Sequence, residues 1–254
     1  GVGVLAPGLN GWQLSRAILA GQASYRAEPL PGYTPEILPA AERRRSSESV
    51  RLAVTVSQEA MIQSSLPLNG VATVFASSDG DGQTLHQICE ALARPEHDVS
   101  PTRFHNSVHN AAAGYWSIAT GSKLPSNSLC AFDDSFAMGL LEAATQLAVE
   151  HFPVLLVAFD LPFPPPLHQV RAVSQVFACA FLLVDEPTPA GLGAWEISLE
   201  DGTVPAALPK IFDGLSNNPA ARALPLLQNL ARQQDETVRL SYFNRSQVVV
   251  KCSR

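Results

Sequence analysis

The chain has 254 residues, of which 46% are hydrophobic and 16% are charged, and its formal net charge is −6. A chain of this length can bury a full core as one large α/β domain or as two small ones. The negative charge argues against a general nucleic-acid binder, which would need a basic field to meet phosphates. The four cysteines lie far apart without a C-x-x-C pair, so we interpret them as reduced thiols rather than a disulfide framework.

The amino-terminal residues, "GVGVLAPGLNGW", lack the basic start and the long apolar middle of a signal peptide. No stretch reaches the length of a membrane span, and the apolar run at 153–159 has the size of a buried strand. We therefore expect a cytoplasmic protein.

Predicted strands and helices alternate along the chain. The amino-terminal residues predict a strand, a tight turn and a helix from about Trp12 to Ala20. The later elements are a helix in 41–64, a strand at 70–78, a helix through Ala93, a helix in 135–150, a strand at 153–159, strands near 175–184 and 193–199, a helix near 218–234, and the closing strands "TVRLSYF" and "QVVVKC". This alternation favours a layered α/β fold with a largely parallel sheet.

Two histidines, His105 and His109, lie four residues apart in the stretch "SPTRFHNSVHNAAAGYWSIATG". On a helix they would share one face and could ligate zinc. However, no third ligand lies nearby in sequence, and the residues between them lack the glutamate of a zincin. We expect neither a metal site here nor a cofactor elsewhere.

Two segments between residues 99 and 150 carry a resemblance to a known family. "SPTRFHNSVHNAAAGYWSI" has a Ser-Pro start, bulky residues, then Asn, small residues and Gly. "LPSNSLCAFDDSFAMGLLEAA" reads as a Pro-Ser strand, a turn and a buried helix. Both resemble the β-ketoacyl synthases of the thiolase superfamily, with a weaker likeness over roughly residues 1–200. In particular, the chain is similar to the short synthase-like proteins of aryl-polyene and type II polyketide pathways, which are taken as chain-length-factor-like partners.

The resemblance implies a single thiolase-like α/β/α domain over residues 1–254. Its first half, 1–200, would be intact, and 201–254 would be a reduced C-terminal remnant. In the family's enzymes, a cysteine at the tip of the turn takes the acyl chain from a carrier-protein thioester. Alignment without gaps places Asp133 there.

An aspartate is a poor acyl acceptor, because the product would be a reactive anhydride. We therefore interpret Asp133 or Asp134 as a helix N-cap that keeps the shape of the turn. Cys130 remains an alternative nucleophile, but it lies three residues earlier on the strand, which displaces its side chain by about 10 Å and reverses its facing.

The family's enzymes also draw two catalytic histidines from their second half. No histidine follows residue 168 here, and 200–254 holds neither an "HGT" nor a glycine-rich "FGG" segment. We therefore expect no acyl condensation by this chain alone.

In thiolase-fold dimers, the segment that corresponds to 100–121 lies against the partner subunit and helps to line the end of the partner's acyl tunnel. The small residues 111–114 would let backbones approach closely at that interface. The tunnel and interface residues that the resemblance implies are Thr102, Arg103, Phe104, His105, Asn106, His109, Asn110, Tyr115 and Trp116.

Three functional hypotheses follow. The first is a non-catalytic chain length factor that forms a heterodimer with a catalytic ketosynthase and meets an acyl carrier protein transiently. The second is a weak decarboxylase or acyltransferase that uses Asp133, Cys130 or His105. The third is a homodimer that binds acyl chains or carrier proteins.

Overall fold

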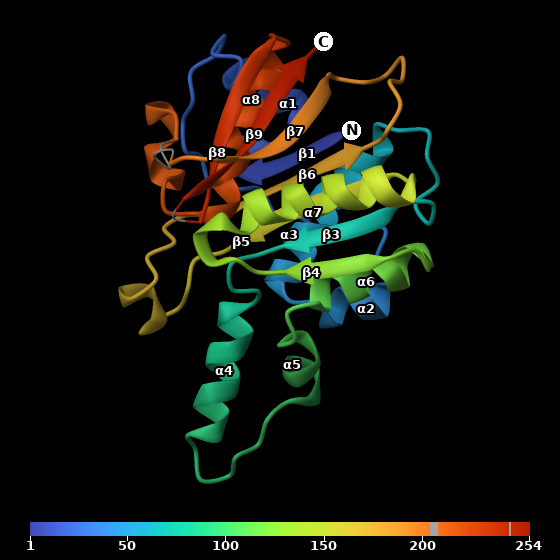
Figure 1. Cartoon of the computed structure of the whole chain (residues 1–254). Coiled ribbons are helices and arrows are strands. Elements are labelled where there is room, and N and C mark those ends of the chain that lie inside the picture. Colours follow the sequence, from blue (N-terminus) through green and yellow to red (C-terminus); the bar gives the residue numbers. More distant parts are fainter. Residues whose placement is uncertain (204–207, 244) are drawn as a thin grey trace.

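The computed structural model describes residues 1–203, 208–243 and 245–254 (Figure 1). At its centre lies a six-stranded sheet with the strand order β2-β1-β6-β5-β3-β4. Its strands are β1 (Val2–Ala6), β2 (Leu9–Asn10), β3 (Ala72–Ala76), β4 (Ser126–Leu129), β5 (Val154–Asp160) and β6 (Phe177–Leu183). The central strand β5 is buried along its whole length, as expected for a sheet that is covered on both faces.

The sheet is mixed, so the prediction of a largely parallel sheet is wrong. Strand β3 runs parallel to β4 and β5, whereas β6 runs antiparallel to β5 and to β1. The reason lies in the connection 161–176, in which the only helix is the short 3-10 helix η2 (Leu167–Gln169). A parallel return is usually made through a crossover α-helix, which this connection does not form.

Helices cover both faces of the sheet (Figure 1). Helices α3 (Glu48–Ile62) and α6 (Ala111–Thr120) pack on one face around a core that includes Trp116. Helix α7 (Ser135–Glu150) packs on the other face around Phe136. The predicted thiolase-like layered α/β/α fold is therefore confirmed.

The C-terminal residues form a second, three-stranded antiparallel sheet in the order β7-β9-β8. Its strands are β7 (Ala194–Asp201), β8 (Glu236–Tyr242) and β9 (Ser246–Ser253). This sheet packs into the same core as α7, together with α1 (Trp12–Leu19) and α8 (Leu224–Arg232). The predicted closing strand pair is confirmed, but the boundary expected at residue 200 falls inside β7.

Two predicted helices are each divided. The region 41–64 holds α2 (Ala40–Arg45) and then α3, because Ser47 caps α3 by accepting a hydrogen bond from the Val50 amide. The region near 218–234 holds the 3-10 helix η4 (Pro219–Ala223) before α8, after another short 3-10 helix, η3 (Lys210–Leu215). Among the described residues, every helix is too short or too polar to cross a membrane.

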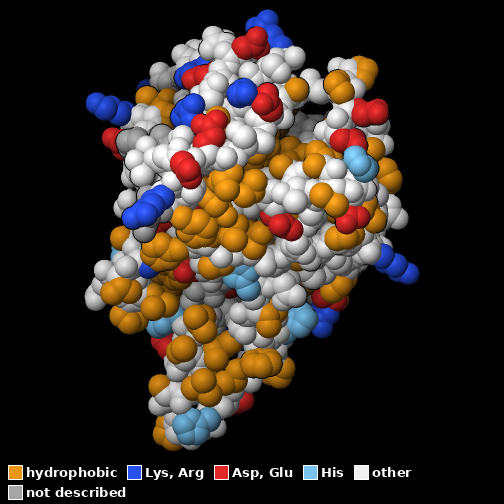
Figure 2. Space-filling view, in the orientation of Figure 1, with side chains coloured by type: hydrophobic (Ala, Val, Ile, Leu, Met, Phe, Trp, Pro, Cys, Tyr) orange, Lys and Arg blue, Asp and Glu red, His pale blue; other side chains and the backbone are white. Residues whose placement is uncertain are grey.

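Helices α4 (Gly82–Leu92) and α5 (Pro101–Asn106) project from the body of the molecule (Figure 1). We call residues 82–108 the arm. Hydrophobic side chains gather on its surface (Figure 2). The exposed large apolar residues of the arm are Leu85, Leu92, Phe104 and Val108.

Candidate functional site

The turn between β4 and α7 is where the family resemblance expects a nucleophile. Phe132 opens the 3-10 helix η1 (Phe132–Asp134) with a φ of +52°, a conformation that side chains other than glycine seldom adopt. The Ser135 hydroxyl fixes the turn, because it accepts from the Ala131 amide at 3.0 Å and donates to the Phe132 carbonyl at 2.7 Å. The strained position of the turn is therefore held by Phe132, one residue before Asp133.

Both aspartates of the turn form ion pairs instead of capping the helix. Asp133 pairs with Arg171 at 2.6 Å, and Asp134 pairs with Arg222 at the same distance. The second carboxylate oxygen of Asp134 accepts the Phe243 amide at 2.9 Å. Asp134 does occupy the N-cap position of α7, but its side chain makes no capping bond. The N-cap interpretation is wrong in its contacts, because the two carboxylates are engaged by the guanidinium groups of Arg171 and Arg222 and, for Asp134, by the Phe243 amide.

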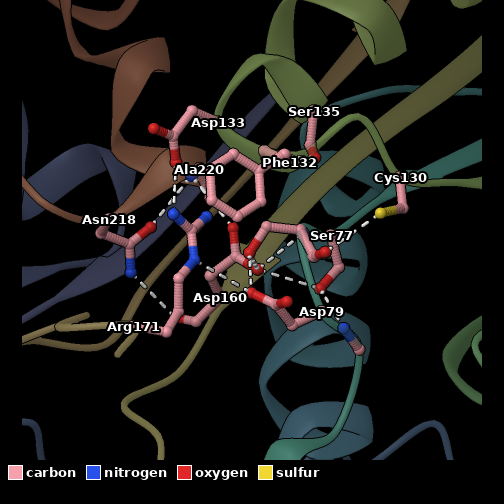
Figure 3. Close-up of polar contacts among 12 residues, drawn as sticks. Ser77, Asp79, Cys130, Phe132, Asp133, Ser135, Asp160, Arg171, Asn218 and Ala220 are labelled. Atoms are coloured by element: carbon pink, nitrogen blue, oxygen red, sulfur yellow. Dashed lines mark hydrogen bonds and ion pairs between the residues drawn. The ribbon is translucent and has the colours of Figure 1, made fainter. Parts of the chain in front are cut away.

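Arg171 ties the turn to the rest of the site (Figure 3). Its guanidinium lies 3.8 Å from the centre of the Phe132 ring, a cation–π geometry, and also pairs with Asp79 at 3.4 Å. We call Asp79, Asp133, Asp134, Arg171 and Arg222 the Asp–Arg cluster. No sequence motif marks its two arginines, which lie far from the turn in the chain, so sequence reasoning missed them.

A cavity of about 290 Å³ opens beside the Asp–Arg cluster. Asp133, Arg171, Asn218 and Arg222 help to line it. The three carboxylates of the cluster outnumber its two guanidinium groups, so the charge that it presents is not positive. An anionic phosphate would gain no net attraction there.

Cys130 lies apart from the Asp–Arg cluster (Figure 3). It is exposed, and its thiol donates to the Ser78 carbonyl at 3.0 Å. Among the described residues, no histidine forms a hydrogen bond with it, and a catalytic thiol needs such a base or cation to become a thiolate. The geometry does not support Cys130 as an activated nucleophile.

Behind the turn, Asp160 ends β5 with only 3% of its surface exposed. It accepts hydrogen bonds from Ser77, Ser78 and the Ala220 amide. Burial raises the pKa of this carboxyl to about 7, although the bonds from Ser78 and Ser77 oppose the shift. No sequence motif marks this residue, so its burial at the site was not predicted.

His105 and His109 do not share a helix. Helix α5 ends at Asn106, and α6 begins at 111. The His105 ring packs edge-on against Tyr115, while the His109 Nε2 contacts the Ser77 carbonyl at 3.1 Å. Within the described parts of the chain, no three potential metal ligands come together.

The predicted tunnel and interface residues divide into two groups. Thr102, Arg103, Phe104 and His105 are exposed on the arm, and Asn110 is exposed just before α6. The remaining four, Asn106, His109, Tyr115 and Trp116, contact residues of their own chain. Asn106 is buried and donates to the Arg45 carbonyl at 2.7 Å, and it accepts the Tyr115 hydroxyl at 3.0 Å.

Tyr115 and Trp116 are almost completely buried in the core on the α3 side of the sheet. Of the small residues before them, Ala112 and Ala113 are also buried in this core. Tyr115 nevertheless borders a cavity of about 340 Å³, whose other lining residues include Arg45, Thr102, His105 and Ile118. Residues of the arm and of α6 therefore line the same cavity.

Comparisons with known proteins agree on the family. The model of the β-ketoacyl synthase N-terminal domain matches residues 15–244. No curated protein matches the chain. Among solved structures, the chain is similar to one of the ketosynthase ApeO in complex with its chain length factor ApeC from Xenorhabdus doucetiae, with 26% identity, a TM-score of 0.74, and coverage of 99% of this chain and 97% of that chain.

Two further structures share the fold at lower identity. The ishigamide ketosynthase/chain length factor is 13% identical, with a TM-score of 0.73 and coverage of 99% and 97% of the two chains. The β-ketoacyl synthase from Burkholderia phymatum STM815 is 14% identical, with a TM-score of 0.60 over 92% of this chain and 71% of that chain. The family match extends over most of this chain, which therefore belongs to the β-ketoacyl synthase family.

Proposed function

We propose that this chain is a non-catalytic, chain-length-factor-like subunit. It pairs with a catalytic β-ketoacyl synthase and shapes the tunnel that holds the growing acyl chain, in polyketide or aryl-polyene assembly. The observation that carries the proposal is the turn after β4, where Phe132 and Asp133 stand in place of a thiol and both contact Arg171. A carboxylate held in an ion pair is stabilised as an anion and gains nothing as a nucleophile.

The similar structures support the pairing. The ApeO–ApeC structure is a complex of a ketosynthase with its chain length factor, and the ishigamide structure is a ketosynthase/chain length factor. Both likenesses extend over nearly the whole of each chain compared. A third similar structure, at 11% identity and a TM-score of 0.71, holds a type II polyketide acyl carrier protein with its ketosynthase. We extend these assemblies to this chain and place the complex in the cytoplasm.

The arm supports a large interface. Its apolar side chains include Phe104, which is 68% exposed, and Leu92, which is 50% exposed. Neighbouring apolar side chains that are left in water are typical of a surface that a partner covers. Strand β4, next to the arm in Figure 1, ends the sheet order, so its outer edge is free to take up a partner's backbone. We expect an interface in the obligate range, above roughly 2,000 Å² in total.

The exposed residues Thr102, Arg103 and Phe104 are the part of the arm that we assign to the end of the partner's tunnel. Phe104 is the bulkiest of them and points into solvent in this chain, so it is free to fill space in another. Tyr115 and Trp116 would act indirectly, because they form the core beneath α5 and α6.

Reconstitution of condensation tests the proposal. The assay compares this chain, a cysteine-bearing ketosynthase of the same family, and their mixture, with acyl and malonyl carrier-protein thioesters as substrates. We expect extended products only from the mixture, and intact-mass analysis should find the acyl adduct on the ketosynthase. An acyl adduct on this chain, or extension by it alone, would establish the second hypothesis instead.

A homodimer that binds acyl chains or carrier proteins is the other candidate that an observation favours. A second copy of this chain could cover the same apolar arm. The homodimer hypothesis predicts a stable self-dimer that does not exchange subunits when the ketosynthase is added, whereas the heterodimer hypothesis predicts exchange.

A further inference from the structure

The arm leaves the body at residues 79–82, and two other segments of the chain hold this root. Asp81 caps α4 by accepting the Thr84 amide at 2.7 Å, and its second carboxylate oxygen accepts the Ser49 hydroxyl of α3 at 2.7 Å. Asp79 pairs with Arg171 of the connection 161–176 at 3.4 Å (Figure 3). The root is therefore fixed to α3 on the one hand and to that connection on the other.

Gly82, the first residue of α4, makes a second contact with the same connection. A Cβ on Gly82 would collide with the ring carbons Cδ1 and Cε1 of Phe163, so the ring lies directly against the backbone of the helix. Gly82 does not have a positive φ, so its backbone conformation does not require glycine. The close approach of the Phe163 ring is what the missing side chain permits. We call this contact the seat.

The position of α4 determines where the end of the arm lies. Helix α4 packs against α5, which carries Phe104, so a rotation of α4 about its root would carry Phe104 with it. Phe104 is 68% exposed and has no packing of its own to hold it in place. The contacts at the root therefore decide how its ring is presented.

We propose that Phe163 is a positioning residue: its ring, seated on Gly82, sets the direction in which α4 leaves the body and so the place of Phe104. The inference rests on the proposed function for what the arm meets, whereas the seat is a property of this chain alone. A seated arm is already in its binding position, so association loses no conformational entropy in ordering it.

Gly82→Ala separates the seat from helix propensity, because the two predict opposite effects. Alanine is the better helix former, so without the ring the change should preserve or strengthen α4. With the ring in place, the added methyl group and the ring would occupy the same space, so α4 must shift. Gly114→Ala in α6 is the matched control, because nothing lies within 4 Å of the Cβ that it would add.

Two native thiols can report the position of α4. Cys89 lies on α4 and Cys130 lies on the body, and both are exposed, whereas Cys179 and Cys252 are buried. Spin labels on Cys89 and Cys130 therefore give one distance between the arm and the body by pulsed electron paramagnetic resonance, in the full chain and without added cysteines. We expect a single narrow distribution in the wild type.

The variants should change this distribution in different ways. Gly82→Ala should displace the peak, and Phe163→Ala should broaden it, because the helix then lacks its seat. The double variant should match Phe163→Ala alone, since the methyl group has no ring to meet, and Gly114→Ala should leave the peak in place. No displacement by Gly82→Ala, or an equal displacement with and without the ring, would overturn the proposal. If Gly82→Ala does not fold, an unchanged narrow peak in Phe163→Ala would overturn it.

Titration with the ketosynthase distinguishes a failure of this inference from a failure of the proposed function. If about one Phe163→Ala molecule in ten keeps the seated position, its dissociation constant for the ketosynthase should rise about tenfold. An unchanged constant beside a broadened distance would overturn the positioning role of Phe163. Absence of binding by the wild-type chain would instead contradict the proposed function, and the distances would still decide whether the seat exists.

Discussion

The arm and the turn after β4 are separated along the chain by α6 and β4, and they are held to the rest of the molecule in opposite ways. The turn is held by the Asp–Arg cluster, by the Phe243 amide and by the Ser135 hydroxyl, all of which belong to this chain. The arm projects from the body and leaves Phe104 and Val108 in solvent. The difference supports the proposal that this chain meets a partner through the arm and not through the turn.

A pair of aromatic substitutions tests this comparison with the largest expected effect. Trp116→Ala should lower the free energy of unfolding by about 3–5 kcal/mol, because a fully buried indole leaves a cavity in the core. Phe104→Ala should change it by less than about 0.5 kcal/mol, because its ring is already in water. Urea denaturation of both variants measures the two values. Similar losses would show that the arm is packed like the core.

Removing one charge of the Asp–Arg cluster should have a smaller effect. Asp134→Asn leaves the guanidinium of Arg222 with a weaker partner in a site where both side chains are mostly buried. We expect a loss of about 2 kcal/mol in the free energy of unfolding. Glu200→Gln, which breaks the exposed pair with Arg239, is the control and should cost little. An equal effect of the two changes would mean that the cluster does not hold the turn.

The reactivity of the cysteine thiols compares the site with the core. Cys89 and Cys130 are exposed, whereas Cys179 and Cys252 are buried, and burial raises the pKa of the Cys252 thiol to about 11. A thiol reagent should therefore label two of the four cysteines in the folded protein and all four in denaturant. Cys130 should react no faster than Cys89, because the Cys130 thiol contacts a carbonyl and no base. Selective, rapid labelling of Cys130 would instead indicate a nucleophile.

The smallest change concerns the products of the complex. If Phe104 ends the partner's tunnel, Phe104→Ala deepens the tunnel, and the complex should release longer chains at an unchanged yield. Leu14→Ala removes an exposed apolar side chain on α1, away from the arm, and is the matched control. Mass spectrometry of the released acyl chains measures their length for each of the two variants. Identical product lengths in both variants would remove Phe104 from the tunnel.

Much of the fold could be predicted because it depends on local patterns. The apolar run of β5 and the alternation in β8 and β9 each indicate a strand without reference to the rest of the chain. The direction of β6 depends on the connection 161–176, whose prolines at 162 and 164–166 disfavour a crossover helix. The sequence thus contained the signal for an antiparallel β6, but the alternation of strands and helices elsewhere outweighed it in the prediction.

The site was predictable only in part. The absence of a thiol at the turn follows from the sequence, since Asp133 can be aligned with the family's motif. Its partners Arg171 and Arg222 lie in segments with no motif, and only the fold brings them to the turn. Burial of Tyr115 and Trp116 was also missed, because the resemblance assigned them to an interface before the packing of α6 was known.

The mass of the assembled complex tests the central claim most directly. Native mass spectrometry of this chain mixed with a cysteine-bearing ketosynthase should show a one-to-one heterodimer, and Leu92→Asp with Phe104→Asp on the arm should abolish it, while Leu14→Asp should not. A self-dimer that persists unchanged in the presence of the ketosynthase, or a heterodimer that is indifferent to the charged arm, would contradict the account.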